Sequence, residues 1–162
     1  MAISGTTTDT SGRTKDLLIF QGLDATKYNV SEPINISFGT TSAYIVGVQK
    51  LLQRFTILFL TGTGSQPDFP AFGTGFLPSV ANSSAGLDAI ALQHIFNFAN
   101  LKLSQVFKDF QDTTTLTLPK DEQLAAATLL DFSVSSGNLS LTIGITSKAG
   151  STVQYVLPFP IA

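Results

Sequence analysis

The stretch "LDFSVSSGNLSLTIGITSKAGSTVQYVLPF", residues 130–159, decides the fold because its apolar residues recur at every second position. A period of two is typical of β-strands that bury one face. Residues that favour turns interrupt the pattern at "SSGN" (135–138) and "SKAGS" (147–151). The stretch therefore predicts a three-stranded antiparallel meander with one apolar face. The apolar positions are Leu130, Phe132 and Val134, then Leu139, Leu141, Ile143 and Ile145, then Val153, Tyr155, Leu157 and Phe159.

Two long helices are predicted before the meander. In residues 41–60 apolar side chains recur at spacings of three and four from Tyr44 to Phe59, and Thr41 or Ser42 is suited to cap the start. Residues 87–111 form the second helix, which is apolar over more than half its circumference. It is therefore either central to the core or covered on a second side by another chain. Its predicted stripe is Leu87, Ile90, Ala91, His94, Ile95, Phe98, Leu101, Gln105 and Val106, with Phe96, Leu103, Phe107 and Phe110 beside it.

The remaining segments complete the organisation of the chain. Residues 1–16 are rich in Thr, Ser and Gly and predict an arm that is flexible or ordered by a partner. "DLLIF" (16–20) and "INISF" (34–38) predict short strands on either side of a polar segment, and residues 62–86 predict an irregular connection. We therefore expect one α+β domain over residues 17–162, with two long helices packed on the meander.

Composition excludes several functional classes. The net charge is −2 and no run of Lys or Arg occurs, so the chain has no electrostatic field for nucleic acid. Cysteine is absent, which excludes disulfides and thiolate metal sites. The longest apolar run, residues 55–60, is too short to span a bilayer, and the N-terminus does not have the pattern of a secretory signal. Charged residues make up only 12% of the chain, which favours a surface that is partly covered in an assembly.

Candidate catalytic residues are few. His94 is the only histidine, and its place on the apolar stripe predicts a packed, hydrogen-bonded side chain. Asp121 and Glu122 are adjacent, and paired carboxylates can divide acid–base work, but neighbours on a strand point to opposite faces. The loop at residues 62–77 lacks the lysine of a phosphate-binding loop, and Pro67 removes a backbone donor. We therefore predict a stiff recognition loop and no catalytic residue, cofactor site or metal site.

The segment "LLQRFTILFLTGTGSQPDFPAFGTGFL" (51–77) resembles the signature of the contractile-tail baseplate wedge, or sheath-initiator, family. That family includes tail proteins once labelled lysozymes and their counterparts in type VI secretion. A second similarity lies in "PKDEQLAAATLLDFSV" (119–134), where Gln123 replaces an expected arginine. Gly64-Ser65-Gln66 likewise replaces the usual Gly-Glu-Arg. The matching residues are Leu60, Thr61, Pro70, Phe72, Gly73, Gly75 and Phe76, then Asp121, Glu122 and Leu124.

The resemblance implies a structural protein without enzymatic activity. It would lie in the tail baseplate of a virion assembled in the host cytoplasm and would bind other wedge proteins, with the tail tube or hub as a further candidate. It would start sheath assembly by adding strands of the sheath protein to its sheet, and Pro158 and Pro160 would limit pairing along the last strand. Two alternatives stay open: a peptidoglycan-cleaving enzyme using Asp121 or Glu122 as general acid, and a type VI secretion baseplate component. The expected interface residues are Pro70, Phe72, Gly73, Asp121, Glu122, Gln123, Val153, Tyr155 and Leu157.

Overall fold

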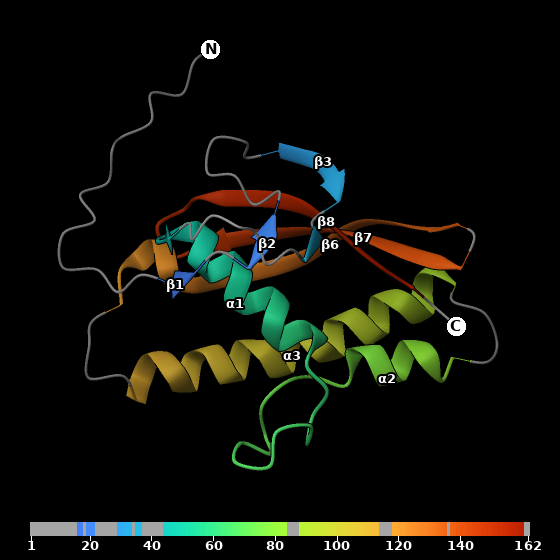
Figure 1. The fold of residues 1–162 in the computed structure, drawn as a ribbon, viewed down its shortest axis with the longest axis horizontal. Coiled ribbons are helices and arrows are strands. Elements are labelled where there is room, and N and C mark those ends of the chain that lie inside the picture. The colour runs from blue at the N-terminus through green and yellow to red at the C-terminus, as the bar shows by residue number, and fades with distance from the viewer. Residues whose placement is uncertain are drawn as a thin grey trace.

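The protein has an α+β fold in which a four-stranded sheet carries the helices on one face (Figure 1). The strand order in this sheet is β3-β8-β7-β6. Strands β6 (Leu124–Ser135), β7 (Asn138–Ser147) and β8 (Thr152–Pro160) pair antiparallel in chain order, as the alternating apolar pattern predicts. The structure, a computed structural model, describes residues 16–17, 19–21, 29–33, 35–36, 44–83, 88–113, 118–135 and 137–160.

The apolar face of the meander is confirmed except in β6, where Leu130 and Val134 are each about half exposed. In β7 the predicted apolar residues are fully buried, and in β8 Val153, Tyr155 and Leu157 are buried as well. In β6 the register shifts between Leu129 and Asp131, so Leu130 is an extra residue of a β-bulge and remains 48% exposed. Strict alternation across residues 130–134 was therefore the wrong prediction. The side chain of Phe159 lies outside the described part.

The N-terminal region adds strands that the sequence only partly predicts. Short pairs form between β1 (Asp16–Leu17) and β5 (Tyr44–Ile45), and between β2 (Phe20–Gln21) and β4 (Asn35–Ile36). Strand β3 (Asn29–Pro33) pairs parallel with β8, although the sequence predicted a polar connection there. A parallel strand finds its partner far along the chain, so it leaves no hairpin signal. The predicted arm, apart from Asp16, lies outside the described residues.

Helix α1 (Val48–Leu60) begins later than the sequence predicted. Tyr44 lies in β5 opposite Leu17, and Gly47 has a φ of 66°, a left-handed conformation that interrupts the helical path. Thr41 and Ser42, the expected caps, lie outside the described residues. From Leu51 onward the predicted stripe is confirmed. It buries Leu51, Leu52, Phe55, Leu58 and Phe59 against the sheet and the other helices.

Helix α3 (Ala89–Thr113) turns a different face to the core from the one predicted. The buried line is Leu92, Phe96, Ala99, Leu103 and Phe107, whereas most of the predicted stripe is half-buried or exposed. Asp88 caps the helix, because its carboxylate accepts a hydrogen bond from the Ala91 amide at 2.6 Å. A short helix, α2 (Phe76–Ala81), replaces part of the expected irregular connection.

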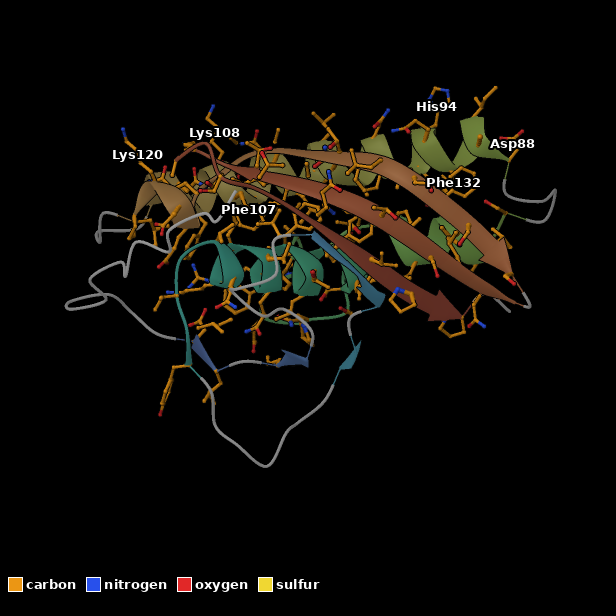
Figure 2. The ribbon with its side chains drawn as sticks, turned by 90° about the horizontal axis from the view of Figure 1, so that it is seen from above. Asp88, His94, Phe107, Lys108, Lys120 and Phe132 are labelled. Carbon is orange, nitrogen blue, oxygen red and sulfur yellow. The ribbon has the colours of Figure 1, made fainter. Side chains whose placement is uncertain are left out.

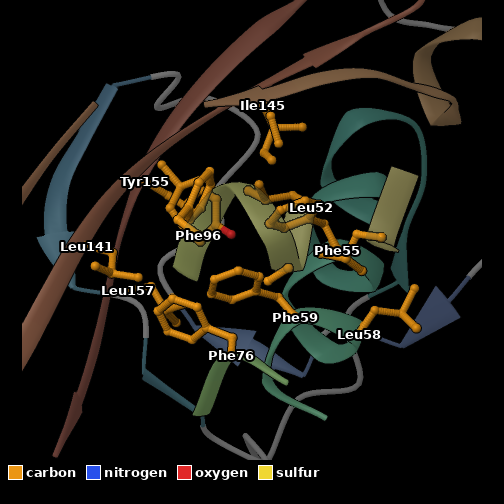
Figure 3. Packing of buried hydrophobic residues seen from close by; sticks show 14 of the residues in the cluster. Leu52, Phe55, Leu58, Phe59, Phe76, Phe96, Leu141, Ile145, Tyr155 and Leu157 are labelled. Atoms are coloured by element: carbon orange, nitrogen blue, oxygen red, sulfur yellow. The ribbon is translucent and has the colours of Figure 1, made fainter. Parts of the chain in front are cut away.

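The core centres on aromatic side chains from all three helices (Figure 3). The Phe59 ring of α1 lies 4.3 Å from the Phe76 ring and 5.6 Å from the Phe96 ring, measured between centroids. Tyr155 of β8 reaches the same core, and its hydroxyl lies 3.2 Å from the Thr56 hydroxyl. Burial raises the pKa of Tyr155 well above its ordinary value, although the hydrogen bond to Thr56 opposes this shift. Tyr155 is therefore a neutral core residue.

Candidate functional site

The outer face of α3 is a strip of exposed apolar side chains. Ile90 is 70% exposed, Phe98 73% and Leu101 71%. These three residues, here called the α3 outer face, lie on one side of the helix, opposite the buried line. His94 lies among them and points away from the sheet, as Figure 2 shows, so the expected packed histidine is wrong. No charged side chain occurs between Ala89 and Leu101 when His94 is neutral.

The loop between α1 and α2 is closed at its base by a clasp of Thr61, Gly73 and Thr74. The Thr74 amide donates to the Thr61 carbonyl at 2.7 Å, and the Thr63 amide donates to the Thr74 carbonyl at 3.0 Å. The Thr74 hydroxyl donates to the carbonyl of Phe59 at 2.7 Å and lies 3.2 Å from the Phe76 amide. One buried threonine thus ties the end of α1 to the start of α2, which gives the loop a fixed geometry.

Gly73→Ala is expected to destabilise the protein by about 3 kcal/mol or more, because it combines backbone strain with a steric clash. Gly73 has a φ of 88°, and a Cβ atom there would overlap the Thr61 carbonyl oxygen. Gly64 is the matched control, since it has a φ of 80° but no atom within 4 Å of the position that a Cβ atom would take. Gly64→Ala should cost only about 1 kcal/mol. Equal midpoints for the two variants in urea unfolding would contradict the clasp.

An apolar groove of about 520 Å³ lies between the loop, α1 and α3. Phe69 and Phe72 of the loop line one side, and Phe107 and Phe110 of α3 line another. Phe69 is 66% exposed, whereas Phe72 packs partly against the core. Of the predicted interface residues in this loop, Pro70 is exposed and Gly73 is buried in the clasp. The loop therefore presents Phe69 and Pro70 to solvent and uses Phe72 and Gly73 internally.

Glu122 forms a buried ion pair with Lys50. The Glu122 Oε2 atom lies 3.1 Å from Lys50 Nζ, and both side chains are shielded from solvent. The Gly47 amide donates to Glu122 Oε1 at 3.2 Å. Because α1 has no acidic residue in its first turn, Glu122 supplies the negative charge that stabilises the N-terminus of that helix. Glu122 is thus a structural residue at the junction of α1 and the sheet.

Asp121 and Gln123 flank Glu122 in a short 3₁₀ turn, η1 (Lys120–Glu122), and at the residue after it. Both side chains are half-buried. The Gln123 amide donates to the Leu118 carbonyl at 2.6 Å, so this side chain holds the local backbone. The two carboxylates do not form an acid pair facing one open site, because Glu122 is enclosed with Lys50.

Val153, Tyr155 and Leu157 do not form an exposed surface. Their side chains are buried in the core of this chain. Part of the backbone edge of β8 is also covered, because β3 pairs with it at Gln154 and Val156. A partner can therefore reach this part of the edge only if β3 leaves it.

The other edge of the meander, β6, is obstructed by side chains. The Asn100 side chain of α3 donates to the Ala127 carbonyl at 2.9 Å. Further along, the Phe132 amide donates to the Asp131 carboxylate at 2.8 Å, next to the bulge at Leu130. Bulges and inward-turned charges on an edge strand discourage pairing with another chain. Strand β6 is thus a poor acceptor around Ala127 and around Phe132.

Sequence reasoning missed the Lys50–Glu122 pair, although one signal was available. Lys50 and Arg54 are the only charged residues of α1, and Lys50 lies among the apolar positions of its first turn. A lysine at such a position needs a buried acid as its partner. Among the described residues, no group of three or more His, Asp or Glu is placed to hold a metal ion. In that same part of the chain, no helix has the length and apolar character to cross a bilayer.

The sheet, the clasp and the enclosed ion pair define an α+β protein that exposes apolar side chains on α3 and on the loop between α1 and α2. No family model matches the chain, and no curated protein matches it. Among solved structures, it is similar to a protein from Geobacter sulfurreducens described as a "putative tail lysozyme". The two are 14% identical, and the match covers 78% of this chain and 97% of the other, with a TM-score of 0.45. This likeness carries no information about what the present chain binds or catalyses.

Proposed function

We propose that this chain is a structural protein of a contractile-tail baseplate, in a phage virion or a type VI secretion system. It binds other baseplate proteins and provides a starting point for the tail sheath protein. The observation that carries the proposal is the α3 outer face, where three large apolar side chains are each about 70% exposed. Contiguous apolar patches on a soluble protein commonly mark binding surfaces.

The sequence resemblance to the sheath-initiator family gives further support. Its central residues, Thr61 and Gly73, meet in the clasp that fixes the loop between α1 and α2. The clasp holds Phe69 and Pro70 in a defined exposed position. A loop whose shape is fixed before binding loses little conformational entropy on docking, which suits recognition of a neighbouring protein.

The sheath contact is proposed to be strand addition to the four-stranded sheet. An added strand gains backbone hydrogen bonds along an edge without requiring a catalytic group or a cofactor. With β6 obstructed by Asn100 and Asp131, the edge beside β8 is the better acceptor.

The alternative of a peptidoglycan-cleaving enzyme receives no support from the acidic pair. Glu122 is buried with Lys50, so it would have to break its ion pair to reach a glycosidic oxygen. We expect no turnover of purified peptidoglycan, measured as release of soluble fragments. Turnover that is lost in Asp121→Asn, with an unchanged fold by circular dichroism, would favour the enzyme instead.

Replacing Phe98 and Leu101 together with serine is expected to exclude the chain from assembled tails while leaving its stability within about 1 kcal/mol, because both side chains are exposed. The measurement is immunoblotting of tails isolated from cells that express the gene cluster encoding this chain. Tyr44→Ser is the matched control, since Tyr44 is 66% exposed but lies in β5. Incorporation of the double variant at the wild-type level, or absence of the wild-type chain from tails, would overturn the proposal.

A further inference from the structure

Strand β3 is the most weakly held strand of the four-stranded sheet. It is the only parallel strand of that sheet, and its register with β8 shifts between Asn29 and Pro33. Pro33 has no amide hydrogen and cannot donate to the ladder. By contrast, β7 and β8 pair without interruption from Asn138–Pro160 to Thr146–Thr152. Removing β3 would therefore break few backbone hydrogen bonds and would leave the meander intact.

The segments around β3 are anchored independently of it. The short pair β2–β4 brings Gln21 opposite Asn35, so the chain enters and leaves the β3 segment at one place. Nearer the N-terminus, the Gln53 side chain of α1 donates to the Leu17 carbonyl and accepts from the Ile19 amide, both at 2.8 Å. Arg54 also pairs with Asp16 at 3.3 Å. Strand β3 can thus leave β8 without releasing β1, β2 or β4; β1 and β2 lie near α1 in Figure 1.

The edge that β3 covers is built to receive a strand. Gln154 has an exposed side chain, while Val153 and Tyr155 on either side point into the core. A strand laid along this edge gains backbone hydrogen bonds and extends the apolar face over the helices. An uncovered edge of this kind would pair with any available chain, and natural proteins commonly cover such edges.

We propose that β3 is a displaceable cover on the β8 edge, replaced during assembly by an extended segment of a neighbouring protein that runs parallel to β8. This inference rests on the proposed function and adds a mechanism that controls access to the acceptor edge. While β3 is in place, the β8 edge at Gln154 and Val156 is not open to another strand. The incoming strand has apolar residues at every second position, which it places beside Val153 and Tyr155. The partner must compete with β3, so only a segment with matching register and side chains is accepted.

A reversible disulfide tests the displacement directly, because the chain contains no cysteine of its own. Asn29 and Gln154 are register partners, so Asn29→Cys combined with Gln154→Cys places two cysteines on strands that lie about 4.8 Å apart. This spacing falls within the Cα separation that a disulfide bridges. The probe is a fluorescent synthetic peptide of residues 26–37, which carries the β3 sequence and can take its place. Binding is measured by fluorescence anisotropy in the oxidised and reduced states of the same variant.

A control disulfide joins β7 to β8 and leaves β3 unconstrained. Thr146 and Thr152 are register partners whose hydroxyls lie 3.1 Å apart, so Thr146→Cys with Thr152→Cys gives an equivalent crosslink. We expect the peptide to bind the reduced Asn29–Gln154 variant at least about tenfold more tightly than its oxidised form, since a crosslinked β3 leaves the open state unpopulated. The control variant should bind equally in both states.

Equal binding of the peptide by the oxidised and reduced forms of the Asn29–Gln154 variant would overturn the inference. If neither form binds the peptide, hydrogen exchange decides. The fragment covering Thr152–Leu157 should exchange faster after reduction if β3 opens, and unchanged exchange would confirm that β3 is a fixed strand. Neither assay contains a tail protein. A chain that exchanges the peptide but is missing from isolated tails would refute the proposed function and leave the displacement of β3 in place.

Discussion

Lys50→Met is expected to lower the free energy of unfolding by about 3–5 kcal/mol, because it leaves the Glu122 carboxylate buried without its partner. The Lys50 ammonium and the Glu122 carboxylate are 3.1 Å apart and enclosed by the protein. Removing the cation also weakens the junction at which Glu122 accepts the Gly47 amide. Urea unfolding followed by circular dichroism gives the change in midpoint and in free energy.

Two further variants distinguish the effect of an unpaired buried charge from a general loss of stability in α1. Lys50→Met combined with Glu122→Leu removes both charges and should recover a large part of the loss, since an apolar pair has no desolvation penalty. Arg54→Met removes the pair with Asp16, which is partly exposed, and should cost about 1 kcal/mol or less. If Lys50→Met and Arg54→Met were equally stable, the ion pair would not have the structural role assigned to it.

Phe59→Ala is the second change with a large expected effect, about 3–5 kcal/mol, because it opens a cavity at the centre of the core. Phe59 is fully buried, and its ring contacts the rings of Phe55, Phe76 and Phe96. The measurement is again the free energy of unfolding in urea. Phe69→Ala is the control, since Phe69 lies on the exposed loop and its replacement should cost about 0.5 kcal/mol. A similar loss of unfolding free energy in the two variants would contradict the central position of Phe59 in the core.

The meander was predictable because its information is local. Apolar residues such as Leu141 and Tyr155 alternate along each strand, and turn residues separate the strands, so pattern and structure agree. The sequence pattern did not reveal the bulge at Leu130, because one extra residue changes the face of every residue that follows. The sequence pattern did not reveal strand β3 either, because its partner, β8, lies at the opposite end of the sequence.

The orientation of α3 could not be read from its sequence because the helix has two apolar stripes. Leu92 and Phe96 mark one stripe, and Ile90 and Phe98 mark the other. Periodicity finds both but cannot say which of them the sheet and α1 will cover. The prediction that a second side of this helix is apolar was nevertheless correct, and it supplies the surface on which the proposed function rests.

The candidate site was predicted in parts. The loop at residues 62–77 was expected to be stiff, and the clasp of Thr61 with Gly73 and Thr74 gives the physical cause. Glu122 was predicted to contact another protein, but its partner is Lys50 of the same chain. The packing of α1 against the start of β6 brings the two side chains together. The position of Lys50 among apolar residues of α1 indicates that it has a buried acidic partner, but it does not identify Glu122 as that partner.

A cryo-EM map of the intact assembled particle would test the central claim, that this chain works by binding its neighbours, most directly. We predict density for the chain at the baseplate, with Ile90, Phe98 and Leu101 of α3 covered by another protein. A map in which the chain is missing from the baseplate, or in which those three side chains face solvent, would contradict the claim.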